Sequence, residues 1–396
     1  MTAKEVHDTE YSAWAEVDLK AIRDNVTAIR RLAAQNKFAL PTRYKGKKTL
    51  ADPARLLAVI KADAYGHGMK EIAQLLFDMD IGFFAVSDTT EGACLRQMGI
   101  TTPVLLFESA LLENVEQIVD LDLTPTVLTI DFARKLNAYA KKFKKRINVH
   151  VNIDTGMGRL GVWHEEAEDF IKTLFTFSQL TVQGIYTHFP AADSDEQFTK
   201  QQLEYFYQLV VNLDRQGLVI PYVHAANSMG LAGYKTDFLN IVRPGLMLYG
   251  LYPDERFKKR LKLKPALSVK SRIVYIKDIK KGRSISYGRS FIAKKDMTVA
   301  TVSIGYYDGY PRVLSNKSHV LIKGVRCPVL GVVTMDQVVV DVTDVPSPKV
   351  GSQVTILGKD KNTVVSADEL AKLSDTIHYE IVCSLGNHLP RIFKKA

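Results

Sequence analysis

Lys61 is the first residue whose position suggests chemistry, because it ends the apolar run LLAVIK at residues 56–61. The polar segment ADAYGHG (62–68) follows it, and its two glycines indicate a turn. A lone lysine at the end of a strand usually marks only the point where the chain enters solvent, since lysine is rarely buried without a partner. The alternative is a lysine held at the mouth of a fold, where its amine forms a Schiff base with a carbonyl compound.

Polar residues also follow other apolar runs of the chain. They are Asp154 with Arg159, His188, Asn227 with Ser228, and Arg243 with Gly245. Taken singly, His188 is explained as a core histidine and Arg159 as part of a surface ion pair. If the runs are successive strands of a barrel, however, their carboxyl ends meet at one face, and these side chains share one site.

The elements that would position these residues are predicted by a series of short apolar or β-branched runs. The runs are LLAVIK (56–61), FFAVS (83–87), PVLLF (103–107), LTPTVL (123–128), INVHVNI (147–153), VQGIYTH (182–188), PYVHAAN (221–227) and IVRPGLMLYG (241–250). Segments with helical periodicity separate most of them, for example 165–177 and 196–217. Strands that alternate with helices indicate a parallel sheet, and eight such units match a (β/α)8 barrel, predicted over residues 12–252. A doubly wound open sheet is the alternative, but no GxGxxG motif follows any of the runs.

The pattern changes after residue 252. The charged, proline-flanked segment 252–265 predicts a junction between two domains. Beyond it, short alternating segments broken by Gly and Asp predict a mostly antiparallel β domain over residues 253–396. Ser366 is predicted to cap a helix near the carboxyl end. The basic segment FALPTRYKGKK (38–48) is predicted to be a solvated insertion.

Composition limits the class of protein. The chain has 396 residues, of which 46% are hydrophobic and 24% charged, as in soluble globular proteins with a large core. The net charge is +10, but the lysines are scattered, which favours a surface for anionic ligands over a nucleic-acid site. The three cysteines lie far apart and form no CxxC pair, so we expect neither a disulfide nor a metal site. No apolar run approaches the roughly 20 residues that span a membrane, and the first residues lack the apolar stretch of a signal peptide, so we expect a cytoplasmic protein.

A series of short motifs follows in order along nearly the whole chain. They are WAEVDL (14–19), VIKADAYGHG (59–68), DTGMGRLG (154–161), THF (187–189), HAANS (224–228), RPGLMLYG (243–250), SYGRSF (286–291), IGYYDGYPR (304–312) and MDQ (335–337). Together they resemble the motifs of the pyridoxal-phosphate-dependent alanine racemases. The resemblance implies an amino-terminal barrel, a carboxy-terminal β domain, pyridoxal phosphate as cofactor and a head-to-tail homodimer with shared active sites. It also implies that the enzyme interconverts L-alanine and D-alanine and so supplies D-alanine for peptidoglycan.

The resemblance assigns two acid/base residues and two supporting residues. Lys61 would hold the cofactor as an imine and, once displaced, act on one face of the α-carbon. Tyr287 from the partner subunit would act on the other face, supported by a chain through His188 to Arg243. By the same resemblance Arg243 faces the pyridine nitrogen of the cofactor. Because arginine can only donate, that nitrogen would stay unprotonated, which favours return of the proton to the α-carbon over side reactions.

The resemblance also implies roles in binding. The phosphate would be held by hydroxyl groups and backbone amides near the last strands. Arg159 and the amide of the partner's Met335 would hold the substrate carboxylate. The residues matching the phosphate set are Tyr65, Ser228, Gly245, Leu246 and Tyr379, and those matching a narrow access corridor are Asp193, Tyr306, Arg312 and Ile377.

Some positions depart from the family pattern. Asn152 stands where many members carry a carbamylated lysine that positions the arginine, here Arg159. A neutral Asn152 would leave a buried guanidinium partly unpaired, which is costly. We therefore expect a small anion, chloride, between the two residues, and the alternative is a direct or water-mediated hydrogen bond. The other departures are Thr334 for a cysteine, Val332 for a corridor arginine and His388 for an arginine.

Other functions remain open at this stage. Val332 removes bulk and charge from the corridor, so a broad-specificity amino acid racemase or a serine racemase is an alternative. A non-catalytic pyridoxal-phosphate carrier built on the same barrel is another. Such carriers lack the β domain, whereas this chain has carboxy-terminal residues that include Tyr287, Tyr306 and Met335.

Overall fold

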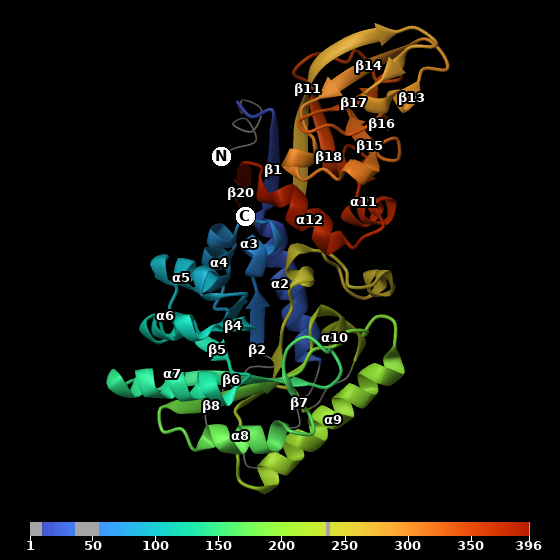
Figure 1. Cartoon of the computed structure of the whole chain (residues 1–396). Helices are drawn as coiled ribbons and strands as arrows, with labels where there is room; N and C mark the ends of the chain where they lie inside the picture. The colour runs from blue at the N-terminus through green and yellow to red at the C-terminus, as the bar shows by residue number, and fades with distance from the viewer. Residues whose placement is uncertain (1–9, 36–54, 235–237, 396) are drawn as a thin grey trace.

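The protein is described by a computed structural model over residues 10–35, 55–234 and 238–395 (Figure 1). The predicted basic insertion at 38–48 lies outside the described residues. Figure 1 shows an elongated molecule, with most strands and helices of the first 250 residues at one end and the second set of strands at the other. Helices α3 (Lys61–Tyr65) and α12 (His378–Asn387) lie between the two parts (Figure 1).

The first part is a parallel, barrel-like sheet. Apart from the short β7 (Val162–Trp163), its described strands overlap the predicted runs. In spatial order they are β10 (Ile241–Val242), β2 (Arg55–Val59), β3 (Phe83–Val86), β4 (Val104–Ser109), β5 (Thr124–Thr126), β6 (Ile147–Asp154), β8 (Leu180–Tyr186) and β9 (Tyr222–His224). The ends of this order are joined by backbone hydrogen bonds. Asn240 N–H donates to Val223 O at 3.0 Å, and Arg243 N–H donates to Ala226 O at 2.8 Å. The predicted barrel architecture is therefore confirmed.

Helices surround this sheet and bury one apolar face each. They are α2 (Leu19–Ala34), α4 (Met69–Asp78), α5 (Thr89–Gln97), α6 (Val115–Asp120), α7 (Ile130–Lys142), α8 (Ala167–Phe175), α9 (Glu196–Arg215) and α10 (Ser228–Gly233). In α9 the side chain of Asp195 caps the first turn, and Phe206, Leu209 and Leu213 face the core. Both segments predicted to be helical, 165–177 and 196–217, contain helices.

The eighth strand is shorter than the apolar run 241–250 suggested. Only Ile241 and Val242 pair with β2, and η3 (Leu246–Tyr249) is a 3-10 helix. Pro244 lies between them and cannot donate a ladder hydrogen bond, so the strand ends before it. The early end places Arg243 and Gly245 at the mouth of the barrel.

The second part confirms the predicted antiparallel β domain. Its main strands are β11 (Leu267–Ile279), β14 (Met297–Val302), β15 (His319–Ile322), β16 (Val325–Leu330), β17 (Val338–Asp341), β18 (Gln353–Asp360) and β19 (Thr363–Val365). Strand β11 pairs with β18 along its first half and with β14 along its second half, which closes the sheet on itself. Ser366 caps α11 (Ala367–Ser374) by accepting from Glu369 N–H at 3.1 Å, as predicted.

The first strand joins the second part and not the barrel. Strand β1 (Ala13–Asp18) pairs antiparallel with β11 and parallel with β20 (Arg391–Lys394). These residues fall inside the range 12–252 that was predicted for the barrel domain, but they pair with strands of the second sheet. Asp18 then caps α2 by accepting from Ala21 N–H at 2.9 Å, so one short segment ties the two parts together.

Candidate active site

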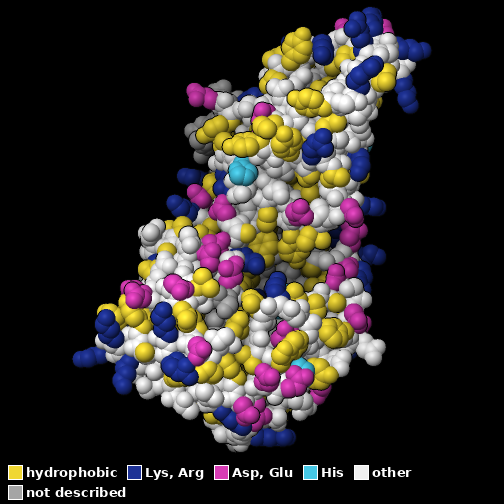
Figure 2. All heavy atoms as spheres, in the orientation of Figure 1, with side chains coloured by type: hydrophobic (Ala, Val, Ile, Leu, Met, Phe, Trp, Pro, Cys, Tyr) yellow, Lys and Arg dark blue, Asp and Glu magenta, His cyan; other side chains and the backbone are white. Residues whose placement is uncertain are grey.

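A cavity of about 660 Å³ opens at the carboxyl ends of the barrel strands. The space-filling view shows the surface hollowed between the two parts of the molecule, with hydrophobic side chains along the hollow (Figure 2). The predicted site residues that line the cavity are Lys61, Tyr65, Asn152, Arg159, His188, Ser228, Arg243, Gly245, Leu246, Ile377 and Tyr379. The structure thus brings together the residues that follow successive strands.

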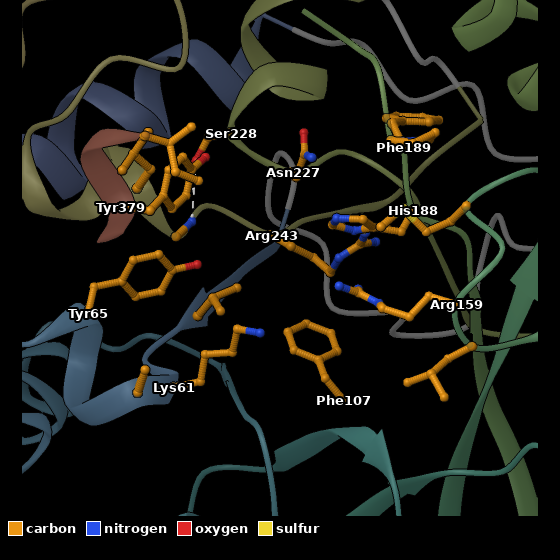
Figure 3. A pocket seen from close by; sticks show the side chains of 18 of the residues that line it. Lys61, Tyr65, Phe107, Arg159, His188, Phe189, Asn227, Ser228, Arg243 and Tyr379 are labelled. Atoms are coloured by element: carbon orange, nitrogen blue, oxygen red, sulfur yellow. Dashed lines mark hydrogen bonds between the residues drawn. The ribbon is translucent and has the colours of Figure 1, made fainter. Parts of the chain in front are cut away.

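Lys61 sits at the start of a left-handed turn that ends β2. Residues Ala62, Asp63, Ala64 and Tyr65 all have φ between 51° and 55°. Each non-glycine residue in this conformation costs roughly 1–2 kcal/mol, so the turn persists only because surrounding contacts hold it. Figure 3 shows the Lys61 amine pointing into the cavity, which Phe107 also lines.

Charged side chains from distant elements hold this turn. Glu91 accepts from Ala62 N–H at 2.7 Å, and Asp63 accepts from Met69 N–H at 2.6 Å. Arg391 of β20 forms an ion pair with Asp63 at 2.5 Å and donates to Gly66 O at 3.0 Å. The orientation of the lysine therefore depends on a residue 330 positions further along the chain.

Arg243 is the central buried cation of the site. It donates to Thr187 O at 2.9 Å, to Ala225 O at 3.0 Å and to His224 Nδ1 at 3.0 Å, and His188 Nδ1 lies 3.4 Å away. Burial lowers the pKa of Arg243 to about 10, so the side chain stays charged at neutral pH. All of its contacts are acceptors, as a donor-only side chain requires.

Histidines around Arg243 are neutral. Burial, followed by the positive charges of Arg243, Arg159 and Lys61, lowers the pKa of His188 to about 3. Because Arg243 donates to Nδ1 of His224, the proton of that imidazole is on Nε2, which lies 2.9 Å from His150 Nδ1. A relay of two neutral histidines thus continues from the arginine into the barrel.

The sequence analysis did not identify His150 and His224 as part of the site. The signal was present, since His150 and Asn152 alternate along β6 and so face the same side of the sheet. Gly184 on the next strand makes room, because a Cβ there would lie 2.5 Å from the His150 ring. The motif HAANS also contains His224.

One end of the cavity is suited to an anion. Ser228 Oγ accepts from the N–H groups of Gly245 at 3.3 Å and Met247 at 3.4 Å (Figure 3). Burial raises the pKa of Tyr379 to about 12, and burial also raises the pKa of Tyr65, so both phenols keep their protons for donation. A Cβ at position 245 would lie 2.4 Å from Tyr65 Oη, so only glycine allows this approach.

Arg159 and Asn152 differ from the expected buried pair. Arg159 is exposed in the single chain and forms no hydrogen bond or ion pair with the described residues. It lies on a loop with positive φ at Gly156, Gly158 and Gly161. Asn152 is buried and donates to Leu160 O at 3.0 Å rather than to the arginine. Figure 3 shows the Arg159 guanidinium directed toward Arg243 and His188, where two positive charges face one cavity.

Asp154 has a structural role. Its Oδ1 accepts from the N–H groups of Gly156 and Met157, both at 2.8 Å, and so shapes the loop that carries Arg159. It does not line the cavity. Within the described part of the chain, no group of three or more acidic, histidine or cysteine side chains is placed to hold a metal ion.

Several predicted residues lie outside the cavity. Tyr287 is 72% exposed and Met335 is 52% exposed, and both belong to the β domain. Tyr306 and Arg312 of the same domain do not line the cavity either. Asp193 follows β8 at the barrel mouth, and its charge contributes to the raised pKa of Tyr379, after burial. A single chain therefore gathers only part of the predicted set.

Comparison with known proteins adds the following findings. The profile described as "Alanine racemase, N-terminal domain" matches residues 39–253, and "Alanine racemase, C-terminal domain" matches residues 266–393. The alanine racemase of Halothermothrix orenii is 37% identical over 382 residues, which is 96% of each chain.

Solved structures agree with these matches. The alanine racemase of Clostridium difficile 630 is 35% identical, with a TM-score of 0.87 over 98% of this chain and 97% of that one. The alanine racemase of Bartonella henselae, solved with covalently bound pyridoxal phosphate, is 27% identical, with a TM-score of 0.84 over 97% of this chain and 100% of that one. Both parts of the fold described above are therefore shared with these proteins.

Proposed function

The chain belongs to the alanine racemase family, and on that premise we propose that it interconverts L-alanine and D-alanine with pyridoxal phosphate and two bases. The observation that carries this assignment is the shared cavity, in which the Lys61 amine, the buried Arg243 cation and the anion-binding end of Ser228 and Gly245 face one space. An enzyme of this class is an isomerase.

The residues of the cavity fit the cofactor. Lys61 would hold it covalently, and the Bartonella henselae structure described above contains covalently bound pyridoxal phosphate. Its phosphate would be held by the hydroxyls of Ser228, Tyr65 and Tyr379 with the amides of Gly245 and Leu246. When bound, pyridoxal phosphate supplies an electron-withdrawing ring that stabilises negative charge at the α-carbon of an amino acid.

Arg243 would donate to the ring nitrogen of the cofactor. Because it is charged at neutral pH and has only N–H donors, it cannot accept a hydrogen bond from a protonated ring nitrogen, so that nitrogen would stay unprotonated. A pyridine ring that is not protonated would be a weaker electron sink, so return of the proton to the α-carbon would be favoured. This arrangement favours racemisation over transamination and decarboxylation.

Proton transfer needs one group on each face of the α-carbon. We assign Lys61 Nζ to one face and the hydroxyl of the partner's Tyr287 to the other. Tyr287 is exposed and outside the cavity of its own chain, which supports a homodimer with shared active sites. A phenol ordinarily gives up its proton only near pH 10, so His188 and Arg243 would stabilise its anion.

Substrate binding would use residues from both subunits. The Arg159 guanidinium and the amide of the partner's Met335 would hold the substrate carboxylate. Asp193 and Ile377, with Tyr306 and Arg312 of the second subunit, would form a corridor narrow enough to favour a methyl side chain. We also propose that chloride lies between Asn152 and Arg159, since Arg159 has no anionic partner among the described residues.

Two alternative functions have less support. A broad-specificity or serine racemase is favoured by Val332, which is smaller than the arginine common at that place in the family. A pyridoxal-phosphate carrier is disfavoured by the β domain at residues 266–393. Among the described residues no helix is both long and apolar enough to cross a membrane. We place the enzyme in the cytoplasm, where it would supply D-alanine for peptidoglycan.

The test combines attachment and turnover. Borohydride reduction of the purified holoenzyme should fix the cofactor to the lysine that holds it, and peptide mapping should find the label on Lys61. Before reduction, the same holoenzyme should racemise L-alanine faster than it racemises any other member of an L-amino acid panel. Lys61→Ala should neither carry the label nor racemise alanine. A label on another lysine would overturn the site, and faster turnover of serine would overturn the substrate.

A further inference from the structure

We infer that Gln202 of α9 is a positioning residue for His188, and that it supports proton transfer on the face of the α-carbon assigned to the partner's Tyr287. The inference rests on the proposed racemase function and adds a residue to it. Gln202 is fully buried and does not line the cavity, so it acts through the groups that it contacts.

Gln202 lies where the backbone pairing of two barrel strands ends. The ladder between β6 and β8 stops at the pair Asn152 and Tyr186. Beyond that pair, side chains continue the connection, since the hydroxyl oxygens of Thr155 and Thr187 lie 2.7 Å apart. The strand ends that carry site residues are therefore held together by side chains and not by the sheet, and α9 supplies one of these side chains.

The amide nitrogen of Gln202 joins the two strand ends. Its Nε2 donates to Thr155 Oγ1 at 3.1 Å and to His188 O at 3.3 Å. Because a backbone carbonyl can only accept, the nitrogen and not the oxygen of the amide must face His188 O. Both hydrogens of one NH2 group are used in this way, so a change at position 202 frees both strand ends at once.

Stability alone does not account for an amide at this place. Gln202 Oε1 is buried and has no hydrogen-bond partner among the described residues. A buried acceptor without a partner is costly, whereas an apolar side chain of similar length avoids that cost. Phe206, Leu209 and Leu213 show that the same face of α9 otherwise carries apolar side chains. The amide is therefore better explained by the groups that it holds than by packing.

His188 stands beside the central cation of the site. Its Nδ1 lies 3.4 Å from a guanidinium nitrogen of Arg243, and Figure 3 shows the two side chains next to each other. Thr187 O accepts from the same guanidinium at 2.9 Å. In the proposed function these groups stabilise the anion of the partner's Tyr287, whereas Lys61 follows β2, which pairs with neither β6 nor β8. Displacing His188 should therefore slow proton transfer on one face and spare the other.

Exchange of the α-hydrogen in heavy water measures the two faces separately. The native holoenzyme should exchange the α-hydrogen of both alanine enantiomers. Tyr287→Phe should exchange only the enantiomer whose hydrogen faces Lys61, so this variant identifies which enantiomer belongs to which base. Gln202→Met keeps the length of the side chain but loses both hydrogen bonds. It should slow exchange on the Tyr287 face about tenfold or more and leave exchange on the Lys61 face within about twofold of native.

Two further variants separate this role from folding. Thr155→Val removes an acceptor of Gln202 and should cause the same one-sided loss, even if Gln202→Met fails to fold. Thr199→Val is the control on the same buried face of α9, because its hydroxyl donates to Asp195 O at 2.8 Å, at the start of the same helix. It should change stability and leave both exchange rates unchanged.

The relative rates on the two faces decide the outcome. Equal slowing on both faces would mean that Gln202 acts on the fold as a whole, and it would overturn the inference. Native exchange rates in folded Gln202→Met would overturn it too. A native holoenzyme that exchanges neither enantiomer would instead overturn the proposed function, and this role with it.

Discussion

At the scale of single residues, the buried histidines make the stability of the chain depend on pH. Burial lowers the pKa of His150 to about 3, and burial with neighbouring cations does the same for His188. Their folded-state values lie below the unfolded value of about 6.5. Above pH 6.5 these imidazoles are neutral in both the folded and the unfolded chain, so they do not make the free energy of unfolding depend on pH. As the pH falls from about 6.5 toward 3, the unfolded chain takes up protons that the folded chain refuses, and stability declines.

The expected result is a lower denaturation midpoint at pH 5 than at pH 7. His150→Gln keeps a hydrogen-bonding side chain beside His224 but cannot be protonated. The free energy of unfolding of this variant should fall less steeply as the pH is lowered. The difference in slope should correspond to about one proton fewer taken up on unfolding. Chemical denaturation at a series of pH values measures the slope. An identical slope in the variant and the native chain would contradict the assignment of His150 as a neutral buried group.

Asn152 sets a second residue-scale prediction, concerning chloride. Its amide nitrogen already donates to Leu160 O, and its second N–H, which has no partner in the described part of the chain, can face an anion beside Arg159. Activity should rise as chloride is added to a chloride-free buffer, and Asn152→Leu should lose both the activity and the response. Asn152→Asp carries its own negative charge, so it should be active without chloride. Added bicarbonate should have no effect, since no lysine is present there to be carbamylated.

A flat chloride response would exclude the anion if a crystal map also showed only water beside Arg159. In that case Asn152 acts through its hydrogen bond to Leu160, which closes the loop that carries the arginine. The two explanations are separated by Asn152→Asp, which supplies a negative charge beside Arg159 but loses the hydrogen bond, since a carboxylate cannot donate to Leu160 O.

At the scale of elements, the left-handed turn α3 is the feature on which the lysine depends. Arg391 contacts Asp63, Gly66 O and Gly386 O, so it joins α3, α12 and β20. Arg391→Met keeps the length of the side chain but loses all three contacts. It should reduce kcat by tenfold or more at unchanged cofactor occupancy, on the general estimate of about 10²-fold for a 1 Å misplacement.

Arg326→Met is the matched control for this prediction. Arg326 also joins two elements, through its ion pair with Glu369 at 2.6 Å, but it lies away from the turn. It should change stability and leave kcat unchanged. If both variants lost only stability, Arg391 would be a general tie between elements and not a positioning residue for Lys61.

The same elements show what a sequence can predict. The barrel strands were found because each is a local run of apolar residues, and Ser366 was found because a cap is local chemistry. The turn after Lys61 was predicted from its glycines, but its left-handed conformation was not, because Ala and Tyr disfavour positive φ and the conformation is imposed by Glu91 and Arg391 from other elements. The pairing of strand β1 was not predictable for a similar reason, since its partners lie about 250 and 375 residues away.

The site shows the same division. Lys61, Arg243 and Ser228 follow local strand ends and were predicted together, whereas the His150–His224 contact joins strands 74 residues apart. Exposure of Arg159 was also not predictable, because it is set by a loop whose conformation depends on three glycines and on Asp154.

At the scale of the whole molecule, the proposed function divides one active site between the two parts of the chain. The barrel carries the cavity that Lys61 lines, whereas Tyr287 and Met335 of the β domain are exposed. Large exposed apolar side chains, among them Tyr306, Tyr307 and Val313, lie on the same domain. Apolar groups gathered on one exposed region are typical of a surface that a second chain covers.

Subunit exchange tests this arrangement. Lys61→Ala and Tyr287→Phe should each be nearly inactive as homodimers, because every site lacks one base. Mixing the two should restore activity, since a hybrid dimer has one site with both bases and one site with neither. With complete random exchange, half of the dimers are hybrids with one intact site each, so the mixture should reach about a quarter of native activity per chain. Differently tagged chains isolated as hybrids prove the exchange, and a proven hybrid without activity would mean that both bases come from one chain.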